Sequence, residues 1–212
     1  MFQERERELS WAAFDPTKAD VTRSRFESPL GWPKVARVTA PAPPAPLTLI
    51  PRLTTARLLL RELQMRDFDA YAANLADPAA TKFTSGPHDR RAAWRIFAAQ
   101  TGSWLLNGGG WWAVEQREGG AVVGTVGAFF RETDDTLVEL GWTLYPPYWG
   151  QGFATEASAA ALQYALDTHG ARQVIAHISA GNLASVGVSK HLGMKYEGDV
   201  DFYGEPVGRY VL

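Results

Sequence analysis

The sequence has no cysteine. That absence excludes a disulfide framework, thiolate metal sites and a cysteine nucleophile, and it fits a reducing compartment. The chain also lacks any run of about 18 apolar residues, and its first ten residues alternate charges where a secretory signal needs an apolar core. We therefore expect a cytoplasmic protein without a membrane partner. A net charge of -2 supplies no overall attraction to nucleic acid, so no nucleic-acid partner is expected.

Apolar residues are abundant, and the prolines are clustered at one end. With 46% hydrophobic and 12% aromatic residues among 212, the chain can form a packed globular core. Eight of the 13 prolines fall within residues 1–51. Because proline removes a backbone donor and fixes φ, that stretch can form neither a long helix nor a central strand. We predict a poorly ordered, proline-rich extension over residues 1–51, followed by one domain over residues 52–212.

Beyond the extension, strand-like and helix-like patterns alternate. Gly119 and Gly120 separate two β-rich runs, which is typical of a hairpin. Hairpins followed by a strand–helix–strand unit predict an α/β chain with a mixed sheet and helices on both faces. Strands are predicted at residues 53–61, 111–116, 121–130, 137–144, 173–179, 196–200 and 207–212, and helices after residue 67 and at 90–105, 154–168 and 185–192.

Three of the predicted helices carry specific expectations. Asp67 is placed to cap the first helix. The second helix should turn Trp94, Phe97 and Ala98 toward the core. Gly170 should end the third helix, because glycine tolerates the left-handed conformation at a helix C-terminus.

The stretch that carries chemical information is residues 148–157, which link a strand ending in a double proline to a helix. A glycine-rich turn that opens a helix leaves backbone N–H groups unpaired at the positive end of the helix dipole, where they suit a phosphate. Gly-x-Gly occurs twice in the chain, about as often as chance predicts, so an anion site and a plain tight turn both remain open. No Gly-Lys pair exists, which excludes a P-loop. Thr155 replaces the third glycine of a dinucleotide fingerprint.

Three spaced motifs resemble one family. Residues 149–154 (Trp-Gly-Gln-Gly-Phe-Ala) resemble the Gln/Arg-x-x-Gly-x-Gly/Ala pyrophosphate loop of the GNAT superfamily of N-acetyltransferases. Residues 139–142 (Glu-Leu-Gly-Trp), together with 182–185 (Asn-Leu-Ala-Ser) and 192–194 (Leu-Gly-Met), are similar to its RimJ/RimL-like branch. The resemblance spans about residues 53–212. It implies the GNAT fold, a mixed and mostly antiparallel central sheet that is splayed in the middle.

The resemblance also implies a cosubstrate, acetyl-coenzyme A, and no metal. Trp149 stands where the superfamily often has Gln or Arg, so the Gln151 side chain would have to compensate in part. Asn182 and Ser185 would lie beside the thioester. The main chain of the preceding strand would pair with the pantetheine arm, and backbone amides of the turn would hold the pyrophosphate. The implied binding residues are Trp142, Thr143, Leu144, Gly150, Gln151, Gly152, Phe153, Ala154, Thr155, Asn182 and Ser185.

Two side chains are candidates for proton transfer. Ser185 would donate a proton to the departing thiolate, although serine is also a common helix-entry residue. Glu139 would accept the proton of the amine, with burial raising its pKa toward neutrality. An ordinary solvated strand residue is the alternative for Glu139.

The sequence thus predicts direct transfer of an acetyl group from acetyl-coenzyme A to a primary amine, either a protein N-terminus or a small molecule, by a monomer or homodimer. The alternative is a non-catalytic sensor that binds coenzyme A or acyl-coenzyme A, or an interaction module. The segments expected to set specificity, residues 65–110 and 203–212, carry no diagnostic motif. Trp104, Trp111 and Trp112 would either wall a pocket or belong to the core.

Overall fold

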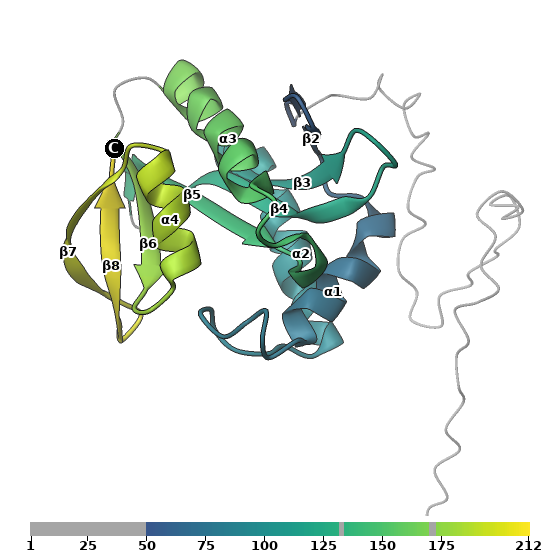
Figure 1. Ribbon diagram of the computed structural model, residues 1–212, viewed down its shortest axis with the longest axis horizontal. Helices are drawn as coiled ribbons and strands as arrows, with labels where there is room; N and C mark the ends of the chain where they lie inside the picture. Colours follow the sequence, from purple (N-terminus) through teal and green to yellow (C-terminus); the bar gives the residue numbers. More distant parts are fainter. Residues whose placement is uncertain (1–49, 132–133, 170–172) are drawn as a thin grey trace, which may run out of the picture. The chain divides into compact units, whose positions relative to one another are not determined.

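A computed structural model describes residues 50–131, 134–169 and 173–212 of the chain (Figure 1). The described residues belong to the compact unit Leu47–Leu212. Apart from Ile50 and Pro51, the predicted extension lies outside the described residues, and so does Gly170. Across the described ranges, no helix is both long enough and apolar enough to cross a membrane.

The strands of the described residues form one eight-stranded sheet in the order β1-β2-β3-β4-β5-β6-β8-β7. Every neighbouring pair is antiparallel except β5 with β6, which is parallel. The predicted mixed sheet is therefore confirmed. Its strands are β1 (Leu53–Thr54), β2 (Leu58–Arg61), β3 (Gly110–Gln116), β4 (Val122–Arg131), β5 (Asp134–Leu144), β6 (Gln173–Ser179), β7 (Lys195–Phe202) and β8 (Glu205–Val211).

The sheet splits between β5 and β6. These strands share only three residue pairs, the last of which is Glu139 with Ile175. Beyond this pair β5 continues along β4 as far as Leu144, while β6 follows β8 as far as Ser179. The two strands therefore diverge, and β5 has an open edge over residues 140–144. The splayed sheet expected from the resemblance is confirmed.

Helices cover both faces of the sheet (Figure 1). On one face α3 (Phe153–His169) buries Ala157, Ala161 and Ala165, as its apolar pattern predicts. On the other face α1 (Phe68–Ala76) and the first half of α2 (Arg90–Asn107) pack around Phe68, Phe97 and other residues of a second core cluster. A short helix, α4 (Leu183–His191), contacts β6 and α3. Two single 3-10 turns, η2 (Met65–Asp67) and η3 (Pro146–Tyr148), precede α1 and α3.

Asp67 is the N-cap residue of α1, as predicted, but its side chain makes no capping hydrogen bond to the helix. Its carboxylate instead accepts two hydrogen bonds from the guanidinium of Arg61, at 2.7 and 2.8 Å, and both side chains are 2% exposed. The single strand predicted over residues 53–61 is also interrupted. The Thr55 amide donates to the carbonyl of Leu58 at 2.9 Å, which makes a turn between β1 and β2.

The inward face of α2 also differs from the prediction. Trp94 is 43% exposed and Ala98 is exposed, whereas Ala93, Phe97 and Trp104 are buried. These buried residues are spaced by four and seven positions, which is the repeat of one helix face. Trp94 lies at the margin of that face and meets Phe68 edge to face, with ring centroids 5.2 Å apart.

Candidate active site

The turn between η3 and α3 presents free backbone N–H groups. Gly150 and Gly152 have φ of +73° and +77°, a conformation that disfavours a side chain. The first helical hydrogen bond runs from the Glu156 amide to the Gly152 carbonyl at 3.1 Å. Within the described part of the chain, no protein acceptor engages the five amides before it, those of residues 151–155. These donors lie at the positive end of a 17-residue helix, so they fit an anion such as a pyrophosphate.

A cation from a distant part of the chain lies against this turn. Arg57, in the turn between β1 and β2, donates from Nη1 to the Gln151 carbonyl at 2.9 Å. Its Nε binds Oε2 of Glu156 at 2.6 Å, and its guanidinium carbon lies 4.5 Å from the centre of the Phe153 ring. A Cβ placed on Gly152 would lie 3.5 Å from Nη2 of Arg57. Arg57 therefore fixes the turn and brings a positive charge beside its free amides.

The side chains of the turn support its backbone. The indole N–H of Trp149 donates to the Leu144 carbonyl at 2.6 Å, which ties the turn to the end of β5. The Gln151 side chain donates to the Pro147 carbonyl at 3.2 Å. One N–H of the Gln151 amide is thus engaged within the turn, and its second N–H is the donor that is expected from the sequence to face phosphate. The nearby positive side chain is Arg57.

Glu139 lies where β5 and β6 separate. Its carboxylate receives both Nε and Nη2 of Arg131 on β4, the latter at 2.8 Å, and Nδ1 of His177 on β6 lies 3.3 Å from Oε1. Burial of the carboxyl acts to raise its pKa, but the proximity of His177 and the hydrogen bonds and charge of Arg131 outweigh burial and lower the pKa. The expected upward shift is wrong. Glu139 instead links three strands at the point where the sheet opens.

The N-terminus of α4 faces the open edge of β5. Asn182 is the N-cap: its Oδ1 accepts the Ser185 amide at 3.2 Å. Ser185 is not the cap, because its hydroxyl oxygen accepts the indole N–H of Trp142 at 3.2 Å instead. Trp142 belongs to the part of β5 beyond its last pairing with β6. The structure therefore brings Ser185 to the open strand edge, while the side-chain oxygen of Asn182 is used for capping.

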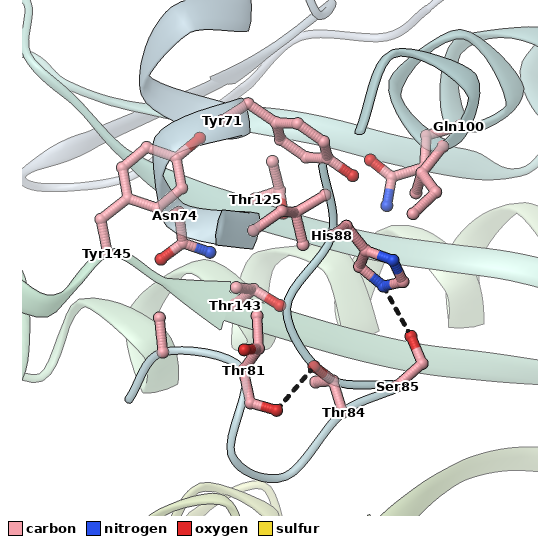
Figure 2. A pocket seen from close by; sticks show the side chains of 13 residues that line it. Tyr71, Asn74, Thr81, Thr84, Ser85, His88, Gln100, Thr125, Thr143 and Tyr145 are labelled. Carbon is pink, nitrogen blue, oxygen red and sulfur yellow. Dashed lines mark hydrogen bonds between the residues drawn. The ribbon is translucent and has the colours of Figure 1, made fainter. Parts of the chain in front are cut away.

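The other face of β5 carries a row of small and polar residues. Strand register places Thr143 beside Thr125, and Gly141 beside Gly127. The Trp111 ring lies over the two glycines, since a Cβ on Gly141 would come within 2.5 Å of it. Trp111 is therefore on the α1 and α2 side of the sheet, whereas Trp104 and Trp112 pack together in the main core. Beside Thr125 and Thr143 lies a cavity of about 150 Å³ (Figure 2).

Sequence reasoning missed Arg57 and the polar residues of this cavity. Arg57 meets Glu156 across 99 positions, and such a distant pair leaves no local pattern. The cavity residues did leave a signal. Asn74 lies on the inward face of α1, and Gln100 lies between Phe97 and Trp104 on the inward face of α2. A polar residue on an apolar helix face is a candidate for a buried site.

A comparison with known protein families gives a match over most of the described domain. The family described as "Acetyltransferase (GNAT) domain" matches residues 57–195, which is more than half of the chain. The chain belongs to the GNAT acetyltransferase family. The matched range begins at Arg57 and includes the split sheet, the glycine turn and α4.

Relatives and solved structures agree with this assignment. A crystal structure of an acetyltransferase from Agrobacterium tumefaciens is 30% identical, with a TM-score of 0.70, covering 77% of this chain and 94% of that one. The Bacillus subtilis protein YkkB is 28% identical over 169 residues, covering 75% of this chain and 94% of its own. RimL, solved in complex with coenzyme A, is 14% identical with a TM-score of 0.63, covering 74% and 94% of the two chains, and shows the fold alone.

Proposed function

We propose that this GNAT acetyltransferase uses acetyl-coenzyme A and transfers the acetyl group directly to a primary amine, of a protein N-terminus or of a small molecule. The observation that carries the proposal is a surface of unpaired backbone groups. It runs along the open edge of β5 from residue 140 to residue 143 and, beyond the Leu144 carbonyl that Trp149 occupies, leads to the free amides of residues 151–155. An extended amide-containing arm that ends in a pyrophosphate matches both parts of this surface.

When bound, acetyl-coenzyme A would supply a thioester that a neutral amine attacks: a C–N bond forms, the C–S bond breaks, the amine gives up one proton to water, and coenzyme A leaves as a thiol. The chain contributes mainly position. The turn amides and Arg57 hold the charged end, and the edge of β5 orients the arm toward the point where the strands part, near Gly141. Holding the two reactants in a fixed geometry lowers the entropy cost of reaching the transition state. A strand amide can also donate a hydrogen bond to the oxyanion that develops on the thioester carbonyl.

Ser185 is assigned the role of proton donor to the leaving sulfur. Its oxygen already accepts from the Trp142 indole, so its own O–H remains free to donate toward the open edge of β5. A hydroxyl is a weak acid, and this contribution is therefore expected to be modest.

Glu139 is assigned a positioning role in place of the general base. A carboxylate that two partners hold in its ionised form, with a lowered pKa, is a poor acceptor for the proton of an amine. The ion pair with Arg131 instead fixes β4 against β5 at the residue where β5 leaves β6. Glu139 thereby sets the angle at which the strands open.

The non-catalytic sensor is not favoured. A sensor needs only the surface for coenzyme A. This chain also has a cavity on the opposite face of the same strand segment, lined by Thr143 of β5. A cavity at that place provides room for a second reactant, which supports transfer over simple binding.

Release of free thiol tests the proposed function. Because the protein has no cysteine, a thiol-reactive dye reports free coenzyme A without background from the enzyme. We expect saturable binding of coenzyme A in calorimetry, and thiol release that depends on added amine, with the acetylated amine detected by mass spectrometry. Failure to bind coenzyme A at millimolar concentration would contradict the proposal. Binding without amine-dependent release across a broad amine panel would favour the sensor.

A further inference from the structure

The cavity beside β5 is built by side chains of α1, of α2, of the segment between these helices, of β4 and of the end of β5 (Figure 2). Its volume of about 150 Å³ equals that of about five water molecules in the liquid, so it can hold a small functional group but not a whole large ligand. Its lining residues are Tyr71, Asn74, Leu75, Ala80, Thr81, Thr84, Ser85, His88, Ile96, Gln100, Thr125, Thr143 and Tyr145.

The lining combines apolar surface with polar atoms and carries no carboxylate, ammonium or guanidinium group. Ten of the 13 lining residues have a polar side chain, and none is Asp, Glu, Lys or Arg. Burial raises the pKa of both Tyr71 and Tyr145, so their hydroxyls stay protonated at neutral pH. A charged group in this cavity would lose its hydration without gaining an opposite charge. The cavity therefore suits an uncharged ligand group that forms hydrogen bonds.

Three buried polar atoms from different elements of this wall lack a partner within the described residues. They are Oδ1 of Asn74 on α1, Oε1 of Gln100 on α2, whose side chain also neighbours the Tyr71 hydroxyl, and the hydroxyl of Tyr145 after β5. Asn74 and Tyr145 are only 7% and 6% exposed. Buried polar atoms are nearly always hydrogen-bonded, because an unsatisfied group carries its full desolvation cost. Three such atoms around one cavity leave hydrogen bonds that a ligand group or ordered water can complete.

The opposite wall is already satisfied. In the segment between α1 and α2, the Thr81 hydroxyl donates to the Asp77 carbonyl at 2.8 Å, and the Thr84 hydroxyl donates to the Thr81 carbonyl at 3.2 Å. The Ser85 hydroxyl and Nε2 of His88 lie 2.8 Å apart (Figure 2). This segment is therefore a preformed frame, and the unpaired atoms are confined to the side formed by the helices and Tyr145.

The cavity adjoins the strand segment that is proposed to hold the thioester arm. Thr143 lines the cavity from β5, beyond the last pairing of β5 with β6. The frame segment also reaches β6, because the Ser179 hydroxyl donates to the Phe83 carbonyl at 2.9 Å. The frame thus spans from α1 to the far strand of the split. A group held in the cavity lies on the opposite face of β5 from α3.

We propose, on the basis of the proposed acetyltransferase function, that this cavity binds a primary carboxamide carried by the acceptor a short distance from its reacting amine. A carboxamide has two N–H donors and one carbonyl acceptor. The two unpaired amide oxygens, Oδ1 of Asn74 and Oε1 of Gln100, need donors, and the neutral Tyr145 hydroxyl can donate. An apolar group of the same size would leave all three atoms unpaired.

An acceptor series of equal size tests this proposal. The small-molecule arm compares 3-aminopropanamide with 3-aminopropanoate and 3-methylbutylamine, which replace the carboxamide by a carboxylate and by an alkyl group. The peptide arm compares tetrapeptides that begin with Asn, Asp or Leu. In one arm at least, kcat/KM for the carboxamide should exceed both isosteres by about tenfold or more, since unpaired buried groups penalise the wrong acceptor. The arm with the larger kcat/KM identifies the source of the acceptor.

Variants of the unpaired atoms provide an independent test. Asn74→Leu and Tyr145→Phe should lower the carboxamide preference toward unity while leaving coenzyme A affinity unchanged, and Tyr196→Phe on the surface is the matched control. Asn74→Leu should also raise the melting temperature of the unliganded protein, because it removes a buried unpaired oxygen. An asparagine with a purely structural role would give a lower melting temperature.

The outcomes separate this inference from the proposed function. Coenzyme A binding and turnover of other amines, without preference for the carboxamide, would overturn the carboxamide site and leave the acetyltransferase intact. An unchanged carboxamide preference in both variants would also overturn it. Absence of coenzyme A binding would remove the proposed function itself.

Discussion

The glycine turn and the cavity beside β5 belong to opposite faces of one sheet. The turn offers backbone groups to a ligand, whereas the cavity offers side chains. The turn uses consecutive backbone amides, those of residues 151–155, made available by two glycines with positive φ. The cavity uses side chains from α1, α2 and the end of β5, and the three unpaired atoms belong to Asn74, Gln100 and Tyr145. A site made of consecutive backbone groups tolerates many side chains, so one turn can serve a whole family. A site made of side chains can differ from one relative to the next.

The glycine turn and the cavity also differ in their electrostatics. The turn combines a helix N-terminus with the guanidinium of Arg57, which suits an anion. The cavity lining has no Asp, Glu, Lys or Arg. If the proposed roles hold, the turn attracts the cosubstrate strongly through charge, and the cavity recognises the acceptor more weakly through individual hydrogen bonds.

The largest expected effect comes from Gly152→Val in the turn. A β-branched side chain disfavours φ of +77° and stands over the free amides, so coenzyme A affinity should fall by about 100-fold. Gly108→Val is the matched control, because Gly108 has φ of +74° at the end of α2, away from the turn. Calorimetric titration of both variants measures the effect. If both variants lost coenzyme A affinity equally, backbone strain alone would explain the loss.

Glu139→Gln tests the ion pair at the place where β5 and β6 separate. The folded-state pKa of Glu139 is lowered, so its ion pair stabilises the fold above the unfolded pKa of about 4.3, and the stabilisation is lost as pH falls through the folded value. The free energy of unfolding should drop by about 2 kcal/mol at pH 7, less than for a fully buried pair because Arg131 is partly exposed. Urea unfolding at several pH values should show the difference between variant and parent shrinking in acid.

The pH–rate profile of Glu139→Gln separates positioning from proton transfer. A positioning role predicts that kcat/KM falls while the acidic limb of the profile keeps its midpoint. Disappearance of that limb in the folded variant would restore Glu139 as the general base.

Arg57→Ala should weaken coenzyme A binding by about tenfold, because the turn loses a hydrogen bond to the Gln151 carbonyl and a nearby positive charge. Arg52→Ala is the matched control. Arg52 lies just before β1, close in sequence to Arg57, but its guanidinium pairs with Glu62 and not with residues 149–155. Affinity measured at two salt concentrations should show a weaker salt dependence for the Arg57 variant alone. Equal affinity of the Arg57 variant and the parent would reduce Arg57 to a bystander.

The smallest effects are expected at the start of α4, where two neighbouring residues have different roles. Asn182→Ala removes a helix cap and should lower the free energy of unfolding by about 1 kcal/mol. Ser185→Ala should lower kcat a fewfold and leave coenzyme A affinity and stability near those of the parent. Thermal unfolding and thiol release on both variants distinguish the two. Full turnover in Ser185→Ala would remove Ser185 from the reaction.

The features predicted from the sequence are those that depend on neighbours along the chain. The hairpin at Gly119 and Gly120, the alanine face of α3 and the glycine turn each follow from spacing within one segment. The family resemblance rests on three short motifs in order along the chain, residues 139–142, 149–154, and 182–185 with 192–194. The split between β5 and β6 came only with the family resemblance, since nothing in a strand's own pattern reveals where a partner leaves it.

The sequence did not predict which charges meet. Asp67 has the right type and place for a cap, yet Arg61 takes its carboxylate because both are buried in the fold. Glu139 was expected to have a raised pKa from burial alone, since Arg131 and His177 come from other strands. The cavity was missed for the same reason. Its residues are spread over 75 positions and converge only in the folded sheet.

The most direct test is hydrogen exchange of individual amides, measured by NMR during titration with coenzyme A. It shows which face of the sheet binds coenzyme A. We expect slower exchange at the amides of residues 151–155 and along the open edge of β5, residues 140–144. Exchange in α1 and in the first half of α2 should not change. Protection confined to α1 and α2, with the turn amides exchanging at their free rate, would contradict this prediction.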